Sequence, residues 1–290
     1  MSDGAAAGTL PVNGVELAWS ERGSDAGDTP TLVLVHGFTG SSYDFALVAD
    51  ELATDRRVVT LDHRGHGGST KTATLEGYTV GQLVDDLTVF LAAVGDGPVD
   101  LLGHSMGGRV VMELTVRHPH LVRSLVLMDT SAWSFLPPGD GVGALVRAWI
   151  TGFDPAQGMP TNLAPSSPEE ALIAACTPVA WQREKEQLQA GTDPWAVKGL
   201  GLELFAEPQG EGALRAQLPS ITCPTTVLVG EHDHPMVDQA PELAAEVADG
   251  RCTVVEGAYH SPQLTHRQEW LAVVRAHLAW TGGRAGAGDR

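Results

Sequence analysis

The segment VDLLGHSMGGRVVMEL, residues Val99–Leu114, joins an apolar run to a helix-like run. Between the two runs a lone serine, Ser105, stands among Gly103, Gly107 and Gly108. Glycine is costly inside regular structure, so such a bracket indicates a place where backbones approach closely. The segment therefore predicts a buried strand, a sharp turn that carries Ser105, and a helix that begins directly after the serine.

Similar short apolar runs recur along the 290-residue chain, and helical patterns lie between most of them. The further strand-like runs are Thr31–Gly37, Arg57–Asp62, Ser124–Ser131, Thr225–Asp233 and Cys252–His260. The helical patterns are Tyr43–Leu52, Val80–Val94, Met106–His118, Pro241–Val247 and Gln268–Trp280. An Asn-Gly pair within Val12–Gly23 adds an N-terminal hairpin. Alternating strands and helices predict an α/β protein with a mostly parallel, doubly wound sheet.

Residues 132–213 interrupt this alternation. The interval has no buried-strand run, and its helix-like pieces are separated by LPPGDG, APSSP and TDP. It also holds four tryptophans, Trp133, Trp149, Trp181 and Trp195. We predict a helical cap over residues 132–213, seated on the carboxyl edge of a core formed by residues 1–131 and 214–290.

The composition excludes some classes of partner. With 18 Lys plus Arg against 36 Asp plus Glu, the formal charge is −18, which disfavours nucleic acid and anionic membrane surfaces. Three separated cysteines suggest no disulfide framework, and neither a secretory signal nor a membrane span is visible. We expect a cytoplasmic protein with a small-molecule substrate, and nothing in the sequence indicates its oligomeric state.

The sequence Gly103–Gly107 reads G-x-S-x-G, between a predicted strand and a predicted helix. This is the setting of a nucleophile elbow, in which the serine is exposed at the top of the sheet. The alternative is a glycine-rich turn that packs or binds phosphate, but neither GHSMGG nor RGHGGS matches G-x-G-x-x-G. The strand–turn–helix setting favours a catalytic Ser105.

A serine nucleophile needs a base, and the base needs an acid to orient it. In the order Ser, Asp, His, the last two strand ends offer Asp233 and His260. Both are expected at the edge of the sheet that carries Ser105. Asp238 and, past an earlier strand, Asp129 are competing acids, and we favour Asp233.

Competing histidines are assigned other roles. His266 and His277 lie in or near the last helix and lack the loop position of the base, while His36, His63 and His104 are interpreted as structural. As a base, His260 would have to be neutral, so activity is expected to fall as the pH drops through about 6.5.

Two backbone N–H groups complete the predicted site. An oxyanion hole should use the N–H of Met106, at the start of the helix, and that of Phe38 in the loop HGFTGSS.

Taken together, HGFTG, DHRGHGGS, GHSMGG, GEHDHP and GAYHSPQ resemble the landmarks of the α/β-hydrolase superfamily, in the same order. The resemblance covers the chain from about the first central strand to the last helix, apart from the cap. It implies Ser105 as nucleophile, His260 as base and Asp233 as acid. Haloalkane dehalogenases and epoxide hydrolases of this fold carry Asp at the nucleophile position, so both are set aside.

The expected activity is a serine hydrolase that cleaves a carboxylic ester, lactone or thioester of a small hydrophobic substrate through an acyl-enzyme. No metal or organic cofactor is implied, because no cluster has ligand spacing. There are three alternatives: a pyruvate-eliminating lyase of the menaquinone pathway, a carbon–carbon bond hydrolase of ring-cleavage products, and a non-catalytic ligand receptor. The family of the lyase also carries Arg at the position of Arg109. For Arg109 we favour a structural pairing with Glu113 over binding of a substrate carboxylate.

Overall fold

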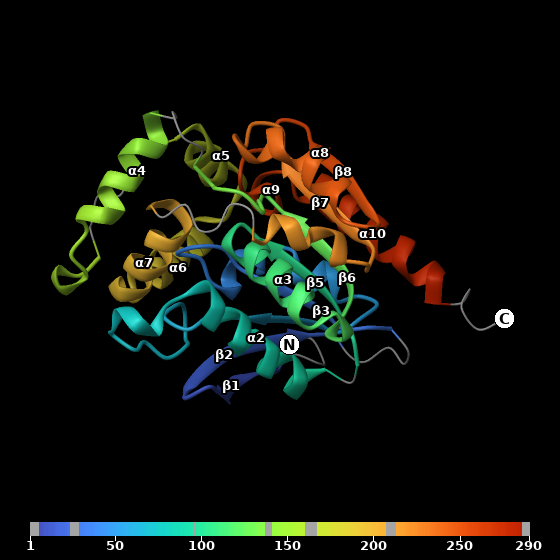
Figure 1. Ribbon diagram of the computed structural model, residues 1–290, viewed down its shortest axis with the longest axis horizontal. Helices are drawn as coiled ribbons and strands as arrows, with labels where there is room; N and C mark the ends of the chain where they lie inside the picture. The colour runs from blue at the N-terminus through green and yellow to red at the C-terminus, as the bar shows by residue number, and fades with distance from the viewer. Residues whose placement is uncertain are drawn as a thin grey trace.

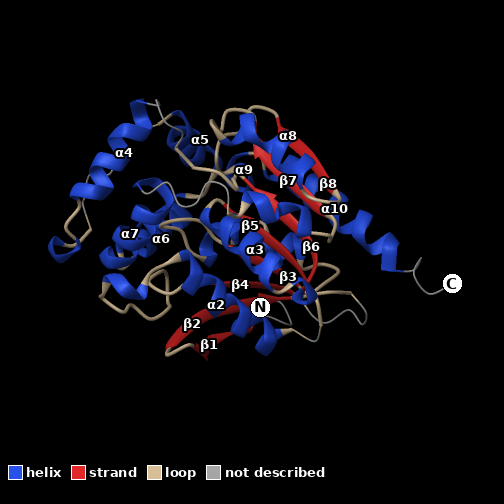
Figure 2. Ribbon diagram, in the orientation of Figure 1, coloured by secondary structure: helices blue, strands red, loops and turns tan. Residues whose placement is uncertain are grey.

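The computed structural model describes residues 6–23, 29–95, 97–136, 141–159, 167–206 and 213–285. Over these residues it forms a mostly parallel, eight-stranded α/β sheet in the order β1-β2-β4-β3-β5-β6-β7-β8 (Figures 1 and 2). The strands are β1 Ala6–Val12, β2 Val15–Arg22, β3 Leu32–Val35, β4 Val58–Leu61, β5 Val99–His104, β6 Val122–Met128, β7 Thr225–Gly230 and β8 Gly250–Val255.

The predicted hairpin is present and begins earlier than its turn signal suggested. Strands β1 and β2 pair antiparallel around Asn13 and Gly14, which have φ of 42° and 80°. Positive φ at both central residues is what a two-residue hairpin turn requires. Strand β2 also pairs antiparallel with β4, and the remaining strand pairs are parallel.

Helices cover both faces of the sheet. They are α1 Ala49–Leu52, α2 Val80–Val94, α3 Met106–Arg117, α4 Gly141–Gly152, α5 Pro168–Cys176, α6 Val179–Ala190, α7 Pro194–Gly201, α8 Met236–Glu246, α9 Pro262–Thr265 and α10 Arg267–Ala285. Shorter turns are η1 Ser42–Phe45, η2 Leu75–Gly77, η3 Pro119–Leu121, η4 Pro155–Gln157, η5 Leu202–Ala206 and η6 Arg215–Ser220.

Alternate side chains of the central strands enter different apolar cores. Val33 and Val35 of β3 pack in the core under α2, α3 and α8, whereas Leu32 and Leu34 pack in the core under α1 and α10. This follows from the two-residue period of a strand, and it explains why the central strands are unbroken apolar runs.

Two predicted helices differ from the structure. The pattern over Tyr43–Leu52 divides into η1 and α1, because Ser41 caps a first short turn and forms a capping box with Asp44. Helix α8 begins at Met236, before the predicted start at Pro241, and contains that proline.

Helices α4 to α7 lie in sequence between β6 and β7, and Figure 1 shows α4, α6 and α7 to one side of the sheet. The described residues of 132–213 form helices and turns and contain no strand. Residues 137–140, 160–166 and 207–212 of this interval lie outside the described residues. No helix in the described part of the chain combines the length and the apolar character needed to cross a bilayer.

Candidate active site

Ser105 occupies the turn between β5 and α3, as its sequence setting predicts. Its φ and ψ are 54° and −118°, a conformation that side chains other than glycine rarely adopt. The Ser105 N–H donates to the Met128 carbonyl (2.9 Å), and the Thr130 hydroxyl donates to the Ser105 carbonyl (2.7 Å). A backbone carbonyl and a side-chain hydroxyl therefore hold the strained residue in place.

The flanking glycines are required by close backbone contacts. A Cβ atom on Gly103 would lie 2.5 Å from the Gly107 carbonyl oxygen, and one on Gly107 would lie 2.4 Å from the Val35 carbonyl oxygen. Neither contact is physically acceptable, so the pattern around Ser105 reflects the crossing of β5 and α3 over β3.

The loop after β3 lies beside Ser105. A Cβ atom on Gly37 would be 3.1 Å from Cβ of Ser105, which places the Gly37–Phe38 backbone against the turn. His36 fixes this loop: its Nε2 accepts from the His63 N–H (2.9 Å), and its Nδ1 lies 2.8 Å from the Gly37 carbonyl oxygen. The ring of Phe38 packs edge-on against Phe205 of η5, with centroids 5.3 Å apart. Of the two predicted oxyanion donors, Met106 directly follows Ser105 in the chain, and Phe38 directly follows Gly37, which lies against Ser105.

His260 and Asp233 meet at the same edge of the sheet. His260 Nδ1 and Asp233 Oδ2 are 2.9 Å apart, after neighbouring strands β8 and β7. The ring of His104, next to Ser105 in the chain, lies 4.8 Å from the ring of His260, and its Nε2 contacts the His260 carbonyl oxygen at 2.8 Å. The structure therefore gathers Ser105, Asp233 and His260 in one region.

The contact between His260 and Asp233 shifts the pKa values of both side chains. Burial disfavours a charged His260, but the Asp233 carboxylate and, further, Glu169 outweigh it and raise the pKa of His260 to about 9. Burial likewise opposes the charge of Asp233, yet its contact with His260 keeps the pKa of Asp233 below the usual range. The expectation of a titration near 6.5 for His260 is therefore revised upward. His104 differs, because burial lowers its pKa to about 3 and keeps it neutral.

The competing residues have other partners. Asp238 contacts the exposed His234 at 2.8 Å, and the ring of His277 contacts Thr226 and Ser124. His266 Nδ1 lies 3.0 Å from the Thr265 hydroxyl. Asp129 lies close to Asp233 and His260, but Nδ1 of His260 is paired with Asp233.

Arg109 has the structural partners expected from its spacing. Its Nε lies 3.4 Å from Glu113 Oε1, and its Nη1 donates to the Trp133 carbonyl (3.3 Å). It lines a separate cavity of about 220 Å³ with Glu113, Arg117 and residues around Leu214.

Glu169 is a charged neighbour that the sequence analysis did not identify. Its helix, α5, packs against α9, directly after the His260 loop (Figure 1). Burial, the largest cause, raises the pKa of Glu169, while the nearby His260 acts in the opposite direction. The sequence signal here, Ser167 with Glu170 three residues later, predicts only a capped helix start, which the structure contains.

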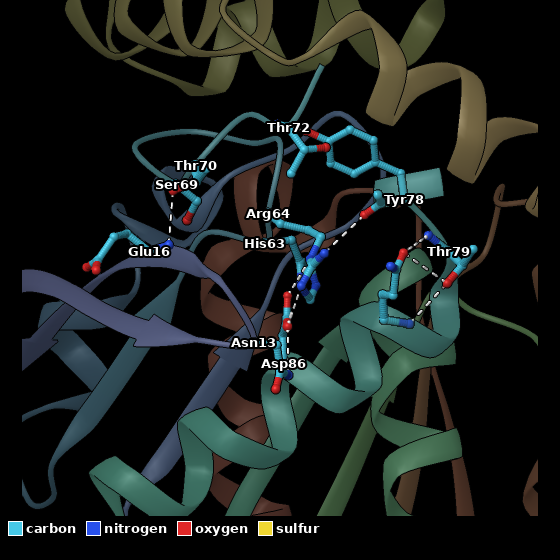
Figure 3. A network of polar contacts seen from close by, with 12 residues as sticks. Asn13, Glu16, His63, Arg64, Ser69, Thr70, Thr72, Tyr78, Thr79 and Asp86 are labelled. Atoms are coloured by element: carbon cyan, nitrogen blue, oxygen red, sulfur yellow. Dashed lines mark hydrogen bonds and ion pairs between the residues drawn. The ribbon is translucent and has the colours of Figure 1, made fainter. Parts of the chain in front are cut away.

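A polar network supports the loop after β4 at the same end of the sheet (Figure 3). Arg64 binds both oxygens of Asp86, at 2.6 and 2.7 Å, and also reaches the Gly77 carbonyl (3.2 Å). Asn13 donates to Asp86 (3.0 Å). Nearby, the Tyr78 hydroxyl donates to Asp193 (2.6 Å), the residue that caps α7.

Among the described residues, Asp129, Asp233 and His260 form one group whose ligand atoms could hold a metal ion, with all three within 4.8 Å of one another. Hydrogen bonds already engage all three groups: His260 Nδ1 pairs with Asp233 Oδ2, and Asp129 Oδ1 accepts from the Gly230 N–H. The arrangement fits a hydrogen-bonded acid–base pair better than a metal site.

Comparison with known proteins agrees with this geometry. Residues 30–267 match the family described as alpha/beta hydrolase fold, and the chain belongs to that family. A pimeloyl-[acyl-carrier protein] methyl ester esterase of Chromobacterium violaceum is 28% identical over 270 residues, covering 87% of this chain and 95% of the esterase. A solved hydrolase from Pseudomonas aeruginosa PA01 superposes with a TM-score of 0.73 at 25% identity, covering 94% of this chain and 98% of that one.

Other relatives match over shorter stretches. An sn-1-specific diacylglycerol lipase of Danio rerio, ABHD11, is 40% identical over 107 residues, which are 36% of this chain and 33% of the lipase. The chain spans one third to about half of the length of the first curated relatives it matches. Esterases and lipases are among these relatives, and the chain shares with them the family described as alpha/beta hydrolase fold.

Proposed function

We propose that the protein is a serine hydrolase that cleaves a carboxylic ester, lactone or thioester of a small hydrophobic substrate, with Ser105, His260 and Asp233 as its triad. The observation that carries the proposal is the placement of Ser105 at a strained strand-to-helix turn, against the Gly37–Phe38 backbone, with the His260–Asp233 pair beside its neighbour His104.

The chemistry follows from these roles. Neutral His260 takes the proton from the Ser105 hydroxyl as the oxygen attacks the substrate carbonyl carbon. The N–H groups of Phe38 and Met106 stabilise the oxyanion, and α3 directs the positive end of its dipole at the same place. The imidazolium, held by Asp233, then protonates the leaving group, and water attacks the acyl-enzyme with His260 again as base.

Aromatic side chains favour a hydrophobic substrate. Phe205 packs between Phe38, beside the elbow, and Phe135, with centroids 5.3 and 6.2 Å away. Residues 132–213, which supply two of these rings, would then act as a cap over the site. Esterase and lipase activities among the relatives agree with an acyl ester as the substrate.

Active-site labelling tests the proposal. Incubation with a fluorophosphonate should add one phosphonyl group to the whole protein, measured by mass spectrometry. Nitrophenyl esters of varied chain length should then be hydrolysed, with the highest kcat/KM for apolar acyl groups. A protein that is neither labelled nor active on any ester of the series would contradict the proposal.

The acid limb of the pH profile should lie above neutrality. His260 must lose a proton to act as base, and neighbouring carboxylates raise its pKa to about 9, so kcat/KM should rise with pH from 6.5 towards 9. One third of the His260 side chain is exposed, so solvent screening should place the midpoint below 9. A stopped ester assay in buffers of constant ionic strength measures it, and a midpoint at or below 6.5 would argue against the raised pKa of His260.

Arg109→Met should leave ester hydrolysis nearly unchanged. Its contacts with Glu113 and Trp133 make Arg109 a structural residue. A charge-assisted bond to a substrate carboxylate would be worth about 1.5–3 kcal/mol, or roughly ten- to hundredfold in kcat/KM. Kinetics with paired neutral and carboxylate-bearing esters distinguish the two roles. A wild-type preference for the carboxylate that the variant loses would identify Arg109 as a substrate-binding residue.

A further inference from the structure

Asp129 is a buried acidic residue that the proposed reaction does not use. It follows β6, is 0% exposed, and has a φ of 47°, in the left-handed region. Two contacts hold it there: its N–H donates to the Leu228 carbonyl (2.9 Å), and its Oδ1 accepts from the Gly230 N–H (2.8 Å). A non-glycine residue in such a conformation persists where its surroundings fix it.

The other oxygen of Asp129, Oδ2, is enclosed and receives no hydrogen bond from a donor of the described residues. The carboxyl groups of Asp129 and Asp233 nevertheless lie together beside His260, with one oxygen of each and a ring nitrogen of His260 within 4.8 Å of one another. An ionised carboxylate only accepts hydrogen bonds, so a bond between two carboxyl groups requires a proton on one of them.

The surroundings place that proton on Asp129. Burial, then the charge of Asp233, raises the pKa of Asp129 well above its ordinary value, and Glu169 of α5 acts in the same direction. The Gly230 N–H acts the other way. Asp233, by contrast, contacts His260, which keeps the pKa of Asp233 low. At this separation the charge of one carboxylate opposes ionisation of the other.

We propose that Asp129 is a neutral carboxylic acid that donates a hydrogen bond to the Asp233 carboxylate and so holds that carboxylate against Nδ1 of His260. Asp129 is then a positioning residue, acting through Asp233. The inference rests on the proposed function, in which His260 is the base. With Asp129 neutral, the pair of acids places a single negative charge, that of Asp233, next to His260. The Nδ1–H of His260 then has one acceptor, the Asp233 carboxylate.

Asp129→Asn is the decisive variant. Asparagine keeps an N–H donor for Asp233 and a carbonyl acceptor for the Gly230 N–H, and it carries no charge. Replacing a neutral acid by a neutral amide should leave kcat within about threefold and leave the midpoint of the acid limb in place. The matched control is Glu169→Gln, which removes a carboxylate that raises the pKa of His260 and should move the midpoint to lower pH.

An ionised Asp129 would give a different result. The Asn variant would then remove a negative charge beside His260, and the midpoint would fall at least as far as in the Glu169→Gln control. That outcome would overturn the proposal. Titration of the His260 ring by NMR gives the same comparison without turnover, so a failure to hydrolyse esters would be distinguished from a failure of this inference.

Asp129→Leu tests the positioning role. It removes the donor to Asp233 and leaves the Gly230 N–H unpaired, so kcat should fall roughly tenfold or more while KM changes little. Full activity in a folded Leu variant would overturn the proposal, as would equal losses in the Leu and Asn variants. If the Leu variant does not fold, the pH midpoint of the Asn variant decides alone.

Discussion

Ser105→Ala should reduce ester hydrolysis by roughly 10⁶ in kcat and abolish fluorophosphonate labelling. The variant removes the hydroxyl oxygen while the left-handed turn and its backbone bonds to Met128 and Thr130 remain. Circular dichroism and thermal unfolding should therefore match those of the wild type, so that the loss reflects chemistry rather than folding.

The matched control for labelling is Ser220→Ala. Ser220 is exposed at the end of η6, and its hydroxyl donates only a local bond to the Gln217 carbonyl (2.6 Å). This variant should be labelled and should turn over esters like the wild type. Label retained on the Ser105→Ala protein, or lost from the Ser220→Ala protein, would move the nucleophile away from Ser105.

The central part of the site could be predicted because local geometry dictates it. Gly103 and Gly107 are needed wherever β5 turns into α3 against Val35, so the glycines mark Ser105 in any sequence that forms this turn. Asp233 and His260 were predictable because they follow β7 and β8, which are neighbouring parallel strands whose ends meet at one edge.

Contacts that depend on how distant elements dock were not predictable. Glu169 reaches the His260 loop only because α5 packs against α9, and no periodicity records that contact. The same limit applies to Lys185 of α6, which pairs with the buried Asp44 of η1. Asp233 contributes most of the upward shift of the His260 pKa, and Glu169 adds to it, so we expect the pH limb above the reference value for histidine.

Asp86→Leu should lower the free energy of unfolding by about 3–5 kcal/mol, the usual cost of removing one partner from a buried ion pair. The side chains of Arg64 and Asp86 are 6% and 2% exposed, and the two form a bidentate pair (Figure 3). Removing Asp86 would leave the Arg64 guanidinium buried with the Gly77 carbonyl and would release Asn13. Urea unfolding followed by tryptophan fluorescence measures the change.

The double variant Arg64→Met, Asp86→Leu separates charge from packing in that result. With no charge left unpaired, an apolar pair of similar volume should recover most of the loss. The effect should extend to the helical insertion, because the Gly65 carbonyl next to Arg64 accepts from the Asp193 N–H (2.8 Å) at the start of α7. We therefore expect Asp86→Leu to raise KM as well, through a loosened α7, and the double variant to restore it. If the double variant is as unstable as the single one, the contribution of this site is packing around Arg64 and Asp86, not compensation of a buried charge.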